Sequence, residues 1–95
     1  MNIKDIHNTE KPVSLQSFFK GEEGTTSAMQ ILKDQQVKEH ITKVPALLIC
    51  ITGKTTFEND EKKKETLLPG DYIFIAPMVK HWLHAHETSQ LLLIK

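Results

Sequence analysis

The chain has 95 residues, 39% of them hydrophobic and 25% charged, which suits one compact domain and leaves too little chain for a second core. Its 12 basic residues balance 12 acidic ones, and the lysines form no stripe with aromatic residues between them, which argues against nucleic acid as a partner. The start has no signal-peptide pattern, and the longest apolar run, Ala46 to Ile51, is too short to span a bilayer. We therefore expect a cytoplasmic protein without membrane contact.

Residues 1–25 are predicted to form an N-terminal arm, Met1 to Lys11, followed by a first strand or a short helical turn in Val13 to Lys20. His7 lies in this arm and is expected to be solvent-exposed. Residues 26–95 contain short β-type runs separated by polar turns, and no segment there supports three turns of helix. The predicted strands are 26–33, 37–42, 45–52, 54–58, 64–68, 72–76, 80–86 and 90–94.

The turn signals support this division. Gly53 is expected to close one strand, Asn59-Asp60 to turn a hairpin, and Pro69-Gly70-Asp71 is the strongest turn signal in the chain. Short strands with turns every 8–12 residues predict an all-β sandwich or barrel. Because so small a domain buries only about 60–65% of its unfolded surface, dimerisation over a sheet face or edge would add stability, and we expect a homodimer.

Two motifs within residues 26–95 resemble those of the cupin family. In its first motif, a His-x-His pair is followed by a glutamate and a closing glycine, and here His40 stands at the first histidine and Gly53 at that glycine. In its second motif, a glycine is followed by a prolyl turn and then a histidine, which Gly70, Pro77 and His81 match. The resemblance implies a single antiparallel jelly-roll β-barrel, that of a small single-domain cupin of the RmlC-like superfamily, over residues 26–95.

The departures from the family pattern bear on metal binding. Thr42 replaces the second histidine of the first motif and Ala46 replaces its glutamate, so the resemblance leaves His40 and His81 from the usual four metal ligands. A stable site for a divalent metal ion needs three or four converging donors. Either further donors come from elsewhere, or the two histidines are partly buried imidazoles that bind a ligand, water, a backbone carbonyl or each other.

Strand alternation from these two histidines predicts which side chains face the interior. His40, Thr42 and His81 would supply the polarity of an otherwise apolar pocket, and they are the predicted ligand-binding residues. Leu48, Cys50, Leu83 and Ala85 would complete the inward set, with Cys50 as a buried thiol. Trp82, His84 and His86 would face outward, as a dimer face or as cover over the outer sheet surface.

Two functions from different classes follow. The first is a small-molecule-binding or sensing barrel with a degenerate metal motif, which captures a small polar metabolite such as a sugar or an organic acid. The alternative is a metal-dependent cupin enzyme of the isomerase or dioxygenase type that uses His40 and His81 as ligands. A structural role, with the cavity filled by side chains, is a third hypothesis.

Overall fold

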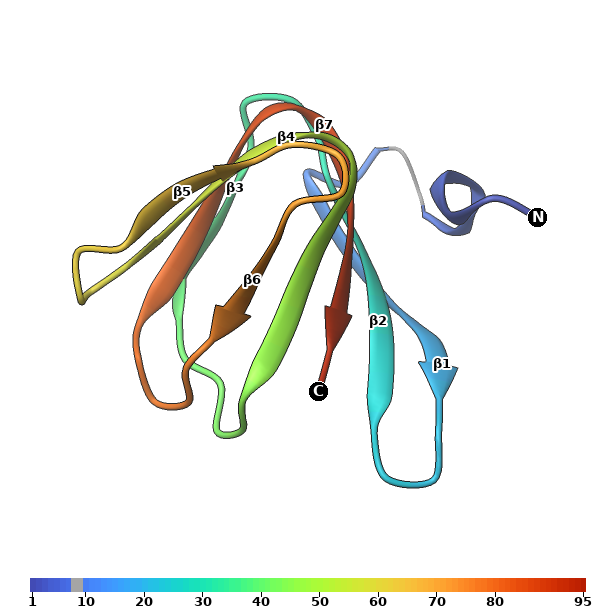
Figure 1. Ribbon diagram of the computed structural model, residues 1–95. Coiled ribbons are helices and arrows are strands. Elements are labelled where there is room, and N and C mark those ends of the chain that lie inside the picture. The colour runs from blue at the N-terminus through green and yellow to red at the C-terminus, as the bar shows by residue number, and fades with distance from the viewer. Residues whose placement is uncertain (8–9) are drawn as a thin grey trace.

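The computed structural model describes residues 1–7 and 10–95. One 3-10 turn, η1 (Ile3–Ile6), precedes seven strands in this part of the chain. All the strand pairings are antiparallel, and Figure 1 shows the strands curling around one interior, so the predicted all-β fold is confirmed. The strands are β1 (Val13–Lys20), β2 (Thr25–Ile31), β3 (Gln36–His40), β4 (Ala46–Asn59), β5 (Lys64–Leu67), β6 (Tyr72–Ile75) and β7 (His81–Ile94).

Two long strands, β4 and β7, form the centre of the fold and pair with each other from Leu47↔Ile94 to Asn59↔His81. The first half of β4 and the second half of β7 lie between β2 and β6, and β1 is added beyond β2. The other halves lie between β3 and β5. We call the two parts the five-stranded half (β1-β2-β7-β4-β6) and the four-stranded half (β3-β7-β4-β5).

Gly53 marks the passage of β4 from one half to the other. The sequence predicts a strand end there, but β4 continues through Gly53, and β7 likewise joins the two strands expected at 80–86 and 90–94. The register shifts several times between Cys50 and Thr55, and Gly53 has a φ of +94°. A Cβ at this position would lie 2.5 Å from the Thr88 carbonyl oxygen, so the close approach of β7 requires glycine.

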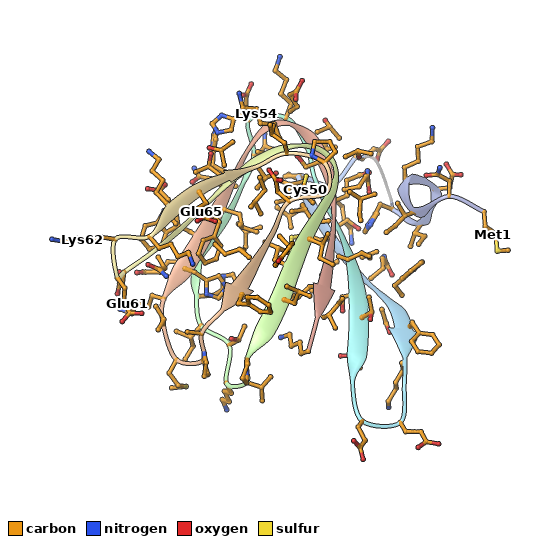
Figure 2. All side chains as sticks on the ribbon, viewed as in Figure 1. Met1, Cys50, Lys54, Glu61, Lys62 and Glu65 are labelled. Carbon is orange, nitrogen blue, oxygen red and sulfur yellow. The ribbon has the colours of Figure 1, made fainter. Side chains whose placement is uncertain are left out.

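The hydrophobic core lies between the two halves. Its largest buried side chains include Phe57, Ile31, Leu48, Leu67 and Leu91. Cys50 is fully buried, as predicted, and burial raises the pKa of its thiol, with a smaller contribution from Asp71. The β4–β5 hairpin tip carries Glu61 and Lys62 out into solvent (Figure 2).

The N-terminal region contributes to the sheet. Val13–Lys20, for which the sequence left a strand and a helical turn open, is a strand paired with β2. His7 is 8% exposed, so its predicted exposure is wrong: its Nδ1 lies 2.8 Å from the hydroxyl of Ser14, which seats the arm on the outer side of β1. Burial lowers the pKa of His7. No helix in residues 1–7 and 10–95 has the length and hydropathy to cross a membrane.

Candidate functional site

A cavity of about 300 Å³ opens into the barrel between its two halves. Apolar side chains from both halves make up most of its wall, and its polar lining consists of His40, Thr42, His81 and Lys95. The volume is at the lower end of the range for small-molecule sites, which are typically apolar with a few converging polar groups. The apolar lining includes Met29, Leu48, Ile75, Leu83 and Leu93.

His40 and His81 form a pair at the edge of the four-stranded half. His40 ends β3 and His81 begins β7, and the two are partners in the strand register. Their ring centroids are 4.1 Å apart with the ring planes tilted by 59°. His81 is 2% exposed and stacks on Phe57 at 5.7 Å, whereas His40 is exposed at the cavity mouth. The structure therefore brings the two predicted site residues together, and their role in binding a ligand or a metal ion stays a prediction.

Backbone carbonyls set the tautomer of both histidines. The Nδ1 of His40 lies 2.9 Å from the Lys38 carbonyl oxygen, and the Nδ1 of His81 lies 3.1 Å from that of Val79. A carbonyl only accepts, so each Nδ1 carries the proton and donates it. Each Nε2 then presents a lone pair when its ring is neutral and an N–H when the ring is protonated, and no other described residue hydrogen-bonds to either atom.

Thr42 lies in the loop after β3 and is buried beside the histidine pair. Its hydroxyl donates to the Val44 carbonyl oxygen at 2.9 Å, and its own carbonyl accepts from the Met78 backbone N–H at 2.8 Å. The hydroxyl proton thus fixes the loop, and the side chain can offer only acceptor lone pairs to the cavity.

Burial is the main reason why the pKa of His81 is lowered. The neighbouring positive charges that His40 and Lys95 can carry lower it further, while the hydrogen bond to Val79 opposes them. The sequence did not identify Lys95 as a site residue. Lys95 directly follows β7 and exchanges two backbone hydrogen bonds with Thr25, a pairing that brings the end of β7 to the cavity and that no local pattern announces.

The donors present do not fit a resident metal ion. Among residues 1–7 and 10–95, no three His, Cys, Asp or Glu side chains gather closely enough to hold one. Ala46 is buried in the core opposite Ile75, and it offers no donor where the family has glutamate. Two imidazoles fall short of the three or four ligands that such a site needs. The predicted metal-dependent enzyme therefore lacks a complete set of ligands among the described residues.

The outward-facing residues of β7 lie away from this site. Alternation holds along the first half of β7: His81, Leu83 and Ala85 are buried, and Trp82, His84 and His86 are half-buried or exposed. The Trp82 Nε1–H donates to Glu58 at 3.2 Å, and the His86 Nε2 lies 2.6 Å from the Thr56 hydroxyl. Trp82 and His86 thus have hydrogen-bond partners on the outer surface, His84 packs edge-on against His86, and none of the three lines the cavity.

Solved structures share this arrangement of strands. A cupin superfamily protein from Desulfitobacterium hafniense aligns over 98% of this chain and 84% of its own, with a TM-score of 0.85 and 17% identity. A cupin-2 domain protein from Shewanella frigidimarina aligns over 100% and 92%, with a TM-score of 0.82 and 16% identity. KdgF from Halomonas sp. aligns over 95% and 87%, with a TM-score of 0.79 and 16% identity.

At such identities the likeness establishes the fold alone. No model of a known protein family matches the sequence, and no curated protein matches it. Several cupin structures align with nearly the whole of this chain. The strand order and the pairing of His40 with His81 agree with the cupin resemblance of the sequence. The chain has the fold of a small RmlC-like cupin domain.

Proposed function

We propose that the barrel binds a small organic acid without the help of a metal ion, as a binding or sensing module. One observation carries the proposal: the Nε2 atoms of His40 and His81 have no hydrogen-bond partner among residues 1–7 and 10–95, and both rings line one mostly apolar cavity. A polar group on a ligand is the natural partner for them, because polar groups removed from water need hydrogen bonds.

The lining of the cavity favours one of the two ligand classes expected from the sequence, a sugar or an organic acid. A sugar carries a hydroxyl on nearly every carbon, and each needs a partner when buried. The cavity offers few, since its wall is mainly aliphatic. An organic acid with an apolar body and one carboxylate needs partners at one end only, so this class fits better than a sugar.

The charges around the cavity favour an anion. Lys95 and the two imidazoles line it, and within the described part of the chain no aspartate or glutamate does. A carboxylate near Lys95 would accept hydrogen bonds from the ammonium and from a protonated His40 Nε2, and charge-assisted hydrogen bonds are about twice as strong as neutral ones. The size is also limiting: a cavity of about 150 Å³ holds benzene, so about 300 Å³ suits a body of roughly ten to twelve non-hydrogen atoms.

The test compares an acid with its neutral isostere. Cyclohexaneacetate and cyclohexaneacetamide would be titrated into chelator-treated protein and followed by NMR chemical shifts. We expect the acid to bind at least tenfold more tightly, with shifts centred on the cavity. Lys95→Met and His40→Gln should each weaken the acid several-fold, and Lys54→Met, which changes an exposed lysine outside the cavity lining, should not.

Equal binding of acid and amide would contradict the role of charge, and absence of both from the cavity would contradict the proposal. Elemental analysis of protein purified without chelator separates the alternative function. One metal ion per chain, lost in a folded His81→Ala variant, would favour the metal-dependent enzyme instead.

A further inference from the structure

The described part of the N-terminal arm rests on the sheet through a single buried side chain. Figure 1 shows η1 outside the barrel, on the side of β1 and β2, and no residue of η1 is buried. Among the described residues from Met1 to Pro12, only His7 is buried. A hollow of about 380 Å³ lies between the turn and Phe18, so the turn does not pack closely there. Within this part of the chain, His7 is therefore the buried anchor of the arm.

The seat of His7 is a polar row on the outer side of the five-stranded half. Its Nδ1 contacts the Ser14 hydroxyl, and Ser14 pairs with Gln30, which in turn pairs with Gln90. The Gln90 amide donates to Gln30 at 2.7 Å. The His7 Nε2, the Gln30 Nε2 and the Gln90 Oε1 are buried without a hydrogen-bond partner among the described residues. Buried polar atoms without partners disfavour the closed arm, so this seat holds it less firmly than a fully bonded one would.

This seat lies directly behind the wall of the cavity. Ser14 faces outward, whereas its neighbours Val13 and Leu15 line the cavity on the other side of β1. The contact of His7 with Ser14 therefore holds β1 at the point where this strand forms the cavity wall.

The strand β1 has few other attachments. Among the described strands it pairs only with β2, and the register shifts between Ser17 and Phe19. Just before its first residue, the Pro12 carbonyl oxygen accepts from the Leu32 backbone N–H at 2.9 Å. A strand that is hydrogen-bonded along one edge opens more readily than a central strand. Loss of the outer contact at Ser14 should therefore loosen the beginning of β1.

His7 is the group in this seat that titrates near neutral pH. The sheet residues of the polar row are Ser14 on β1, Gln30 on β2 and Gln90 on β7, and none of them ionises. The charged residues of the described arm are Lys4, Asp5, Glu10 and Lys11. Burial is the cause that lowers the pKa of His7. A protonated ring is therefore more stable on the open arm, where water solvates it, than in the closed seat.

We propose that the arm is a pH-sensitive strap on the cavity wall: neutral His7 clamps β1 at Ser14, and protonation of His7 releases the arm and loosens β1. The open arm takes up a proton as the pH falls through about 6.5, so the closed arm is favoured at pH 8 and loses stability below pH 6.5. One pH unit below that value, the equilibrium has shifted toward the open arm by at most about tenfold. The effect on ligand binding rests on the proposed function, since a looser Val13 and Leu15 leave a less complete apolar wall for the acid.

The first test follows the arm and β1 without a ligand. The ¹H–¹⁵N NOE of the Asp5 amide reports the order of the arm, and the hydrogen-exchange protection factor of the Leu32 amide reports the start of β1. We expect both to fall between pH 8 and pH 5.5, with a midpoint that coincides with the titration of the His7 ring. Ser14→Ala should lower both at pH 8 already. His84→Gln, which removes an outer histidine of β7 outside the seat, should leave the pH dependence unchanged.

The second test measures the binding of cyclohexaneacetate to the wild type and to His7→Gln, whose side chain cannot be protonated. The ratio of the two dissociation constants cancels the titration of the ligand and of His40 and His81, which both proteins share. We expect the ratio of the wild-type constant to that of the variant to rise about three- to tenfold between pH 8 and pH 5.5.

Four outcomes separate the parts of the proposal. An arm that stays ordered at pH 5.5, or is released with a midpoint apart from that of His7, would overturn the strap. Release of the arm with unchanged protection of Leu32 would show that the arm does not hold β1. A constant ratio of dissociation constants, with both ligand-free changes present, would overturn the coupling to the cavity. Absence of cyclohexaneacetate binding at pH 8 would contradict the proposed function instead, and the ligand-free test would then decide on the strap by itself.

Discussion

The two halves of the barrel differ on their outer surfaces, although the same two strands run through both. In the four-stranded half, β7 alternates strictly, with His81, Leu83 and Ala85 inside and polar or amphipathic side chains outside. In the five-stranded half, the same strand is apolar on both sides from Leu91 to Ile94. Because a strand that alternates is typical of a sheet with one side in water, whereas an apolar strand is typical of a sheet covered on both sides, the two halves differ in the outer surface that they present.

The cavity draws different contributions from the two halves. The four-stranded half supplies the histidine pair, whose rings are held by backbone carbonyls. The five-stranded half supplies Met29, Leu93 and Lys95. Most of the polar lining thus comes from the four-stranded half, while much of the apolar wall comes from the five-stranded half.

The largest effect is expected at Gly53, where β4 crosses between the halves. Gly53→Ala places a Cβ against the Thr88 carbonyl oxygen and the Ser89 backbone, so β7 must move and the two halves separate. We expect a loss of more than about 3 kcal/mol in the free energy of unfolding, measured with urea.

Gly70→Ala is the matched control for this prediction. Gly70 also has a positive φ, of +92°, but a Cβ there meets no atom of the described residues within 4 Å. Backbone strain alone should cost about 1–2 kcal/mol. Equal losses in the two variants would show that conformation, and not the contact between β4 and β7, makes Gly53 necessary.

The second prediction compares two adjacent leucines of β7. Leu91 is fully buried in the core, and Leu91→Ala should cost about 2–5 kcal/mol at any protein concentration. Leu92 is half-buried on the outer side of the five-stranded half, and Leu92→Ala should cost about 1 kcal/mol in the monomer. If a second copy covers this face, the midpoint of thermal unfolding rises with protein concentration in the wild type and rises less in Leu92→Ala. An identical concentration dependence in both would exclude Leu92 from the interface.

The smallest effect is expected from acidification, which lowers the free energy of unfolding through two histidines. His81 begins β7, and His7 lies in the N-terminal arm that contacts β1. Burial lowers the pKa of each histidine in the folded chain. The unfolded chain takes up protons first as the pH falls through about 6.5, so these groups destabilise the fold below that pH and have no effect well above it. Each contributes at most about 1.4 kcal/mol per pH unit.

Urea unfolding between pH 8 and pH 5, at one protein concentration, measures this dependence. His7→Gln and His81→Gln should each flatten the loss of stability below pH 6.5 relative to the wild type. A slope unchanged in both variants would mean that carboxyl groups alone produce the acid dependence.

The sequence predicted the features that depend on local residue patterns, such as turns. It did not predict the features that depend on pairing between distant segments of the chain. The β4–β5 hairpin and the turn before β6 follow from polar and glycine-containing turns, and the meeting of His40 and His81 follows from the family resemblance. Gly53 was taken for a strand end because a glycine bulge and a turn have the same local composition. The burial of His7 and the place of Lys95 at the cavity depend on pairing between distant segments, which no local pattern contains.

The position of β7 in the fold has a consequence for how the chain folds. It is the last of the described strands in sequence, yet it pairs with β2, β3 and β4, and its partner residues lie up to 68 positions away, as in Thr26↔Ile94. Earlier strands have little sheet to join until β7 has been made, because forming such distant contacts first requires closing long loops. A growing chain that ends before β7 can therefore pair Ala46 to Ile49 with β6 on one edge only, and the other edge of β4 stays open until β7 joins, which is the kind of unpaired apolar edge that favours aggregation.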